Sequence, residues 1–254
     1  EQYAACRDAV LVREGRPVTL RTLDLGADKA DASGIALPRE PNPALGLRGV
    51  RLALARPALL RTQLRAMLRA SAHGPVRILV PMVSQREEML AVRRHLRECE
   101  RELRREGHPV GAHTPLGAMI EVPAAAFALA TLLDTMDFVS IGTNDLLAAD
   151  RGNDAVGALF SPLHPAVIRA LHEILAACRR TRKPASICGE MAGDPQYTRL
   201  LLALGLTELS LHPANILEVR AAVRRCELSA LRRRAGALLR ARDRTAVERA
   251  VARL

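Results

Sequence analysis

Two acidic side chains follow short apolar runs of the sequence, where they could bind a metal ion. Glu121 stands in Met119-Ile120-Glu121-Val122-Pro123, and Asp145 ends Ile141-Gly142-Thr143-Asn144-Asp145. A buried carboxylate without a partner is too costly to keep, so Glu121 needs a neutralising group. Two carboxylates, completed by ligand oxygens and water, are what Mg²⁺ typically binds. We therefore predict a magnesium site at these two residues. The alternatives are a helix cap for Asp145 and an arginine partner for Glu121.

Three arginines stand where they could bind a phosphate group. Arg21 breaks the apolar pattern of Val18–Asp24, Arg48 follows Gly46-Leu47, and Arg151 precedes Gly152-Asn153-Asp154. The planar guanidinium presents several donors in a fork that matches phosphate oxygens. Each arginine taken alone is more simply explained as a surface residue, so only their joint arrangement indicates an anion site.

A cysteine next to a glycine is a candidate proton donor. Cys188 lies in Ser186-Ile187-Cys188-Gly189-Glu190, where the glycine lets the backbone and the thiol approach a ligand closely. Free cysteine is among the most buried residue types, so by position alone a structural role is the simpler interpretation. The same structural role is expected for Cys6, Cys99, Cys178 and Cys226. The seven histidines form no HxxxH or HExxH pattern, so a histidine metal cage is not expected.

Short apolar segments and amphipathic stretches alternate along the chain, and they would position these residues. Six segments are typical of strands, namely Val18–Asp24, Val76–Pro81, Leu116–Val122, Phe138–Gly142, Ala185–Gly189 and Glu208–Leu211. The stretches expected to be helical are Pro57–Ala72, Ser84 to Gly107, Ala124–Leu133, Pro165–Arg182, Pro195–Leu204, Ala214–Arg225 and the tail from Leu228. A capping box of Ser84 and Glu87 should start the second helix, and Asp194 with Pro195 should start the fifth.

Repeated alternation of strand and helix predicts an α/β fold with a parallel sheet. At 254 residues, a (β/α)₈ TIM barrel is favoured over an open sheet. Two further strands would have to be short, one of them near Ala44–Arg48. In such a barrel the chemistry lies where strands end and the following loops begin, which is where the candidate residues stand.

The composition favours one soluble, cytoplasmic domain. The chain is 49% hydrophobic, yet no run approaches the roughly 20 apolar residues that span a bilayer, and its five cysteines form no CxxC pair. The net charge of +11 raises the possibility of nucleic-acid binding. Only Lys29 and Lys183 are lysines, the arginines are widely spread, and aromatic residues make up 2% of the chain. We therefore expect no nucleic-acid partner and no membrane association.

Several longer strings carry a more specific signal, in the same order as in a known family. They are Arg-Thr-Leu-Asp-Leu-Gly-Ala-Asp-Lys (21–29), Asn-Pro-Ala-Leu-Gly-Leu-Arg (42–48), Gln-Leu-Arg-Ala-Met-Leu-Arg-Ala-Ser (63–71), Ile-Gly-Thr-Asn-Asp-Leu (141–146), Asp-Arg-Gly-Asn-Asp (150–154) and Cys-Gly-Glu-Met-Ala-Gly-Asp (188–194). Together they resemble the phosphoenolpyruvate-utilising enzymes, and within them the C-terminal domain of phosphoenolpyruvate-protein phosphotransferases, called Enzyme I. The Asp-Arg-Gly-Asn-Asp string favours Enzyme I over the related dikinases and synthases.

The resemblance implies a role for each candidate residue. Arg21, Arg48 and Arg151 would hold the phosphate of phosphoenolpyruvate, with Arg151 also catalytic, and Asn144 would add an amide contact. The carboxylates named above would bind Mg²⁺ as the cofactor. Cys188 would protonate the enolate to pyruvate, a task for which a thiol is a competent general acid.

The resemblance also implies the assembly in which the chain works. Residues 17–254 would form the barrel and dimerise with a second copy, and residues 1–16 would be a linker or helix from a preceding region. The phosphoryl group would pass to a histidine on a separate N-terminal domain, and through it to the phosphocarrier protein HPr or its nitrogen-branch counterpart. None of the histidines here stands in the Thr-Ser-His context of that acceptor. The chain should therefore depend on another domain for transfer.

One segment departs from the family pattern. Between Asp145 and Asp150 the chain has only Leu146-Leu147-Ala148-Ala149, a shorter stretch than the family usually has. If the stretch is helical, losing about four residues keeps the facing of Arg151 but shifts it by roughly 5 Å. The alternative function is therefore a dimerising or metabolite-sensing module that binds phosphoenolpyruvate but does not turn over.

Overall fold

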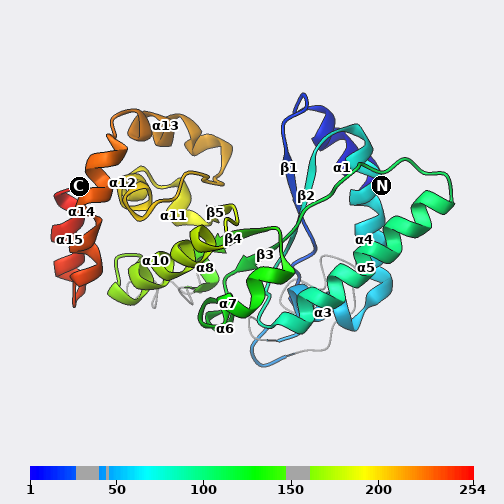
Figure 1. Cartoon of the computed structure of the whole chain (residues 1–254), viewed down its shortest axis with the longest axis horizontal. Coiled ribbons are helices and arrows are strands. Elements are labelled where there is room, and N and C mark those ends of the chain that lie inside the picture. Colours follow the sequence, from blue (N-terminus) through cyan, green and yellow to red (C-terminus); the bar gives the residue numbers. More distant parts are fainter. Residues whose placement is uncertain (27–39, 44–45, 147–160) are drawn as a thin grey trace. The chain divides into compact units, whose positions relative to one another are not determined.

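The computed structural model describes residues 1–26, 40–43, 46–146 and 161–254 (Figure 1). These residues form two compact units, which we describe separately. Unit 1 consists of Glu1–Ile120 with Thr131–Phe138, and unit 2 consists of Glu121–Ala130 with Val139–Leu254. The described residues contain five strands, in the sheet order β1-β2-β3-β4-β5, namely β1 Val18–Arg21, β2 Val76–Val80, β3 Leu116–Ile120, β4 Phe138–Gly142 and β5 Ala185–Cys188.

The helices follow the strands along the chain, as an α/β fold requires. The α-helices are α1 Gln2–Leu11, α3 Gly49–Ala55, α4 Pro57–Ala70, α5 Arg86–Arg105, α6 Pro123–Phe127, α7 Leu129–Leu132, α8 Thr143–Leu146, α10 Pro165–Arg180, α11 Glu190–Gly193, α12 Pro195–Leu204, α13 Ile216–Arg224, α14 Leu228–Arg240 and α15 Arg244–Ala252. Short 3₁₀ turns lie at η2 Ser71–His73, η3 Leu133–Thr135 and η4 Pro213–Asn215. Among the described residues, every helix is too short or too polar to cross a membrane.

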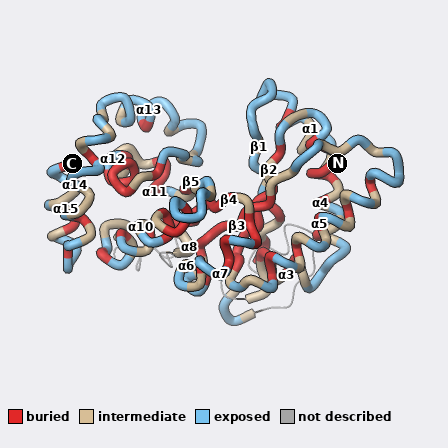
Figure 2. Tube along the Cα trace, in the orientation of Figure 1, coloured by how far each residue is buried: buried red, intermediate tan, exposed pale blue. Residues whose placement is uncertain are grey.

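In unit 1 the three strands pair in parallel. Val18 of β1 pairs with Val76 of β2, and Ile78 of β2 pairs with Leu116 of β3. All five residues of β3 are buried, as Figure 2 shows, whereas β1 alternates between half-buried and exposed residues. A strand buried on both faces is the expected form in a parallel sheet, because helices cover it.

Helix α5 begins one residue later than predicted. Its N-cap is Gln85, and the carboxylate of Glu88 accepts hydrogen bonds from the backbone N–H of Ser84 at 2.7 Å and of Gln85 at 3.0 Å. The capping acid is therefore Glu88, and the prediction of Ser84 with Glu87 was wrong by one position. The predicted end is confirmed, because Gly107 takes a positive φ of 77° just after the helix.

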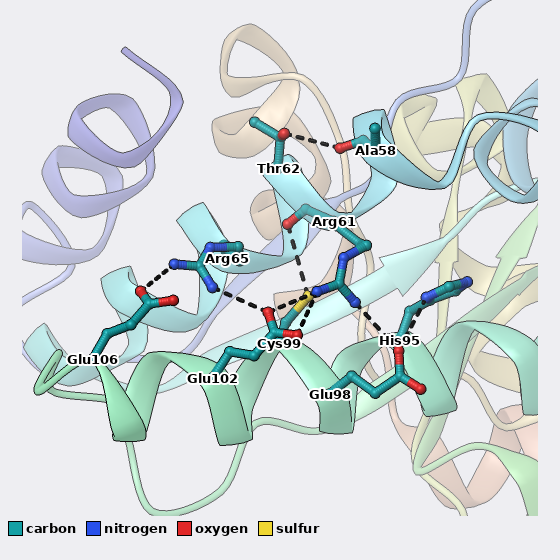
Figure 3. A network of polar contacts seen from close by, with 9 residues as sticks. All are labelled: Ala58, Arg61, Thr62, Arg65, His95, Glu98, Cys99, Glu102 and Glu106. Carbon is teal, nitrogen blue, oxygen red and sulfur yellow. Dashed lines mark hydrogen bonds and ion pairs between the residues drawn. The ribbon is translucent and has the colours of Figure 1, made fainter.

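Helices α4 and α5 are joined by a ladder of charged groups (Figure 3). Arg61 of α4 donates to both carboxylate oxygens of Glu102, at 2.7 and 2.6 Å, and to Glu98 at 3.2 Å. Arg65, one turn further along, pairs with Glu102 at 3.3 Å and with Glu106. The Arg65 guanidinium holds the pKa of the Glu106 carboxyl below its usual value. These ion pairs hold α4 at one axial position relative to α5.

In unit 2, β4 and β5 pair in parallel from Val139 with Ala185 to Gly142 with Cys188. The predicted strand Glu208–Leu211 is reduced to one parallel bridge between Ile187 and Leu209. This bridge is held by hydrogen bonds from Ile187 N to Glu208 O at 3.1 Å and from Ser210 N to Ile187 O at 2.8 Å. The extended stretch is short because η4 begins soon after it, at Pro213.

Two other sequence predictions were wrong in detail. Of the predicted strand near Ala44–Arg48, residues 44–45 lie outside the described residues, and Arg48 is the N-cap of helix α3. The predicted helix Ala124–Leu133 is divided into α6, α7 and η3. The α/β fold with parallel strands is confirmed. The described residues contain five strands and one bridge, so the eight-stranded barrel stays a prediction.

Candidate functional site

Two of the three predicted phosphate-binding arginines converge on one carboxylate in unit 1. The side chain of Asp24 follows β1 and is 7% exposed. It accepts a hydrogen bond from Arg48 Nε at 3.0 Å and another from Arg48 Nη2 at 2.7 Å. Arg21 Nη1 lies 4.0 Å from the same carboxylate. The paired hydrogen bonds fix the plane of the Arg48 guanidinium, since such bidentate pairs constrain both partners.

One arginine of this cluster stays accessible to solvent. Two guanidinium groups share one carboxylate, and the side chain of Arg21 remains 50% exposed. The exposed Arg21 guanidinium can contact a phosphate from solvent, while Arg48 is held in one orientation by its two hydrogen bonds. Asp24 was not assigned a function from the sequence. The only signal was an acidic residue at the end of the predicted strand Val18–Asp24, and its hydrogen-bonding partner lies 24 residues away.

The two predicted metal ligands both belong to unit 2. Glu121 is the first residue after β3 and is 2% exposed. Asp145 lies inside the single turn of α8, directly after β4, and is half-buried. An acidic group in a first helical turn is favoured by the partial positive charge of the free N–H groups there. Both side chains offer the hard oxygen donors that Mg²⁺ prefers, so this donor set fits the predicted ion.

The described residues contain no group of three or more histidine, cysteine, aspartate or glutamate side chains arranged to hold a metal. A metal at Glu121 and Asp145 would thus need further oxygen atoms from a bound ligand or from water. This requirement agrees with the usual coordination of Mg²⁺, which keeps several waters and substrate oxygens.

The loop after β5 packs tightly against the turn after β4. Asn144 Oδ1 accepts a hydrogen bond from the backbone N–H of Glu190 at 3.2 Å. Gly189 has φ 93° and ψ −176°, a conformation that side chains rarely tolerate. A Cβ atom at Gly189 would lie 2.6 Å from Thr143 Oγ1 and 2.8 Å from Asn144 Oδ1. Glycine is therefore required both by the backbone and by the space.

Cys188 is the last residue of β5, and its thiol contacts β4. Ser140 Oγ donates to Cys188 Sγ at 3.6 Å, and Cys188 Sγ donates to the carbonyl oxygen of Ile141 at 3.4 Å. Cys188 is half-buried, whereas Cys99 and Cys178 are 0% and 1% exposed. Burial raises the pKa of the Cys178 thiol to about 11. The structural roles predicted for Cys99 and Cys178 agree with this burial, and Cys188 is the more accessible thiol.

Asn144, the predicted amide contact, thus lies beside the loop that follows Cys188, and both belong to unit 2. Arg21 and Arg48 are brought together in unit 1. Arg151 and most of the shortened segment lie outside the described residues.

Comparison with known families matches residues 1–228 to the family described as "PEP-utilising enzyme, PEP-binding domain". A phosphoenolpyruvate-protein phosphotransferase of Cupriavidus necator is 49% identical over 225 residues, which cover 87% of this chain and 38% of the relative. An enzyme of the same name from Geobacillus stearothermophilus is 42% identical over 229 residues, which cover 89% of this chain and 39% of the relative. The chain thus spans about two fifths of the length of these curated relatives.

A comparison of structures supports the fold alone. A citrate lyase from Burkholderia xenovorans aligns with a TM-score of 0.51 and 24% sequence identity. The alignment covers 76% of this chain and 67% of the lyase. At this identity the likeness is evidence for a shared α/β architecture and for nothing about chemistry.

Proposed function

We infer the function from one premise: the chain belongs to the PEP-utilising enzymes, and its residues 1–228 match their PEP-binding domain. We propose that it is the phosphoenolpyruvate-binding part of a phosphoenolpyruvate-protein phosphotransferase. The observation that carries the proposal is the 49% identity to a relative of that name over 225 residues. We further propose that the parallel strands belong to a complete (β/α)₈ barrel, that the protein works in the cytoplasm, and that two copies form a dimer.

Arg21 and Arg48 have the chemistry to bind the phosphate of the substrate. The pairing of Arg48 with Asp24 supports this role, because it holds the guanidinium in one orientation before any ligand arrives. Pre-oriented donors stabilise developing charge without reorganising during the reaction. In this proposal Asp24 is a positioning residue, and Arg151 adds a third guanidinium.

Glu121 and Asp145 would hold Mg²⁺, whose charge would stabilise the negative oxygens of phosphoenolpyruvate when the ion is bound. The position of Glu121 directly after β3 supports a role in binding a cation, because its carboxylate supplies hard oxygen donors at a strand end. Asn144 would orient the substrate by its amide group, and its hydrogen bond to Glu190 N fixes that side chain.

Cys188 would supply a proton to the carbon that becomes the methyl group of pyruvate. Its half-buried position at the end of β5 supports this, since a donor must be reachable from the site. The phosphoryl group would leave on a histidine of another domain, and from there it would pass to HPr or its nitrogen-branch counterpart.

The direct test is calorimetric titration of phosphoenolpyruvate with and without Mg²⁺. We expect saturable binding that requires the ion, and at least about tenfold weaker binding by Glu121→Gln, because the substitution removes one charged oxygen ligand. Glu88→Gln is the matched control, because Glu88 is also buried but serves to cap a helix. It should lower stability and leave affinity unchanged. Equal affinity of Glu121→Gln and the wild type would refute the metal assignment.

A second experiment separates the enzyme from a module that only binds. Cys188→Ala should retain phosphoenolpyruvate binding but fail to release pyruvate when a phosphoacceptor domain is supplied as a separate chain. If the wild type also binds without releasing pyruvate under these conditions, the chain is a binding module and the proposed turnover is wrong.

A further inference from the structure

The last two helices form an accessory element beyond the family domain. The family match ends at residue 228, where α14 begins. Leu231, Leu238 and Val247 are buried, and α14 packs against α10, α12 and α15. Asp243 caps α15 by accepting a hydrogen bond from Ala246 N at 2.8 Å. The element is thus built with an apolar core and a defined cap.

Positive charge is concentrated in this element. Residues 228–254 contain eight arginines and two acidic residues, which gives a net charge of +6 out of the +11 of the whole chain. Arginine is common throughout this sequence, so number alone would not indicate a site. What matters is where the side chains lie.

Five of these arginines line one hollow. The hollow between α14 and α15 has a volume of about 530 Å³ and is lined by Arg233, Arg234, Ala237, Arg240, Ala241, Ala246, Arg249, Ala250 and Arg253. The lining contains no acidic side chain. Figure 2 shows exposed, half-buried and a few buried residues along both helices. A hollow of this volume is in the size range of small-molecule sites.

Only part of this charge is used to hold the helices together. Arg234 donates to the carbonyl oxygens of Arg253 at 2.9 Å and of Leu254 at 3.2 Å, which caps the end of α15. In the part of the chain that the structure describes, the guanidinium groups of Arg240, Arg249 and Arg253 have no hydrogen bond or ion pair. Arg249 and Arg253 lie one turn apart on one helix face, where like charges repel. An anion in the hollow would relieve this repulsion.

We propose that the α14–α15 hollow binds a small anion that carries two or more phosphoryl groups. Guanidinium groups match phosphate oxygens, and several of them around one hollow favour a multiply charged ligand over a single carboxylate. The remaining lining is alanine, with no aromatic ring on which a base could stack. Recognition therefore acts on the phosphate chain and is indifferent to any base attached to it.

The test is calorimetric titration of the full chain with sodium tripolyphosphate as the probe, at low and at physiological ionic strength. We expect saturable binding at one site, weakened about tenfold by Arg240→Ala and by Arg249→Ala, because each substitution removes a charge-assisted contact. Arg242→Ala is the matched control, since Arg242 is exposed between the same helices but does not line the hollow. It makes the same change in net charge and should alter the affinity less than about twofold.

Two further measurements, a competition with phosphoenolpyruvate and a comparison with duplex DNA, identify the site and the ligand class. An excess of phosphoenolpyruvate should not displace the probe. Displacement would place tripolyphosphate in the proposed substrate site and overturn the inference while leaving the proposed function intact. The inference is also wrong if Arg242→Ala weakens binding as much as Arg240→Ala does, or if duplex DNA binds more tightly than the probe. Both results would indicate a diffuse basic surface.

Discussion

Substituting Gly189 with alanine tests how the ends of β4 and β5 are held together. The residue has φ 93° and ψ −176°, a region used almost only by glycine, and forcing a side chain into it costs about 1 to 3 kcal/mol. The new methyl group would also lie 2.6 Å from Thr143 Oγ1. Thr143 is 0% exposed and donates a hydrogen bond to Cys188 O at 3.0 Å, so it has little freedom to move aside. Overpacking of this kind costs a further 1 to 3 kcal/mol, roughly.

The chain offers a matched control in Gly107. It also has a positive φ, of 77°, but a Cβ atom there would meet no other atom within 4 Å. Gly107→Ala should therefore lose about 1 kcal/mol of unfolding free energy, from the backbone alone. Gly189→Ala should lose about 2 to 5 kcal/mol, from backbone and packing together.

Urea unfolding followed by circular dichroism measures both free energies, and calorimetry with phosphoenolpyruvate reports on the site. In Gly189→Ala the loop that follows Cys188 must move away from the turn after β4, so we expect weaker binding even under conditions where the variant is folded. Equal destabilisation by the two substitutions would falsify the steric argument, because the backbone term would then account for the whole effect.

Three other predictions follow from contacts within the units. Asp24→Asn should lower the free energy of unfolding by about 2 kcal/mol and weaken phosphoenolpyruvate binding, because Arg48 loses its charged partner; urea unfolding and calorimetry measure the two effects. Glu102→Gln should lower the free energy of unfolding by about 1 kcal/mol in low salt and by less in 1 M salt, because the charged ladder between α4 and α5 is partly exposed. A loss of stability that does not depend on salt would contradict an ionic origin. Burial raises the pKa of Cys178 to about 11 from a usual value of 9.0, so the unfolded chain ionises first as the pH rises. Between pH 9 and pH 11 the free energy of unfolding of the wild type should therefore fall by about 2 to 3 kcal/mol more than that of Cys178→Ala. Parallel curves of unfolding free energy against pH for the two proteins would refute this.

Apolar runs allowed most of the strands to be predicted from the sequence. Phe138–Gly142 was predicted with its observed ends, because it is apolar and is bounded by Asp137 and by a polar turn. The predicted strands at Val18 and Leu116 were too long, since the residues after Arg21 and Ile120 leave the sheet where polar side chains begin. Apolar periodicity reports burial and is therefore least informative at strand ends.

Helix starts were harder to predict, because neighbouring residues offered the same signal. Glu87 and Glu88 both stand three residues after a possible cap, at Ser84 and Gln85 respectively. The structure uses Glu88, which reaches two backbone N–H groups. Only the direction of the incoming chain decides between such options, and that direction is set by tertiary packing.

For the site, the sequence predicted candidate residue types and strand-end positions but not their partners. Arg48 and Asp24 were both visible as polar residues beside apolar runs, yet their bidentate pairing depends on the path of the chain between them. The steric need for Gly189 was equally hidden, because it depends on Thr143 from a different strand end. Contacts between residues far apart in sequence are fixed by the fold, so local patterns do not reveal them.

The hydrogen bond from Cys188 Sγ to Ile141 O gives the thiol a resting rotamer. In that rotamer the S–H bond is directed at the backbone of β4, so its hydrogen is not available to another acceptor. Delivery of the proton elsewhere requires rotation about the Cα–Cβ or Cβ–Sγ bond. Infrared spectroscopy can follow such a rotation, because the S–H stretching band shifts when its acceptor changes. Ser140→Ala should shift this band relative to the wild type, because it removes the hydrogen-bond donor to the same sulfur.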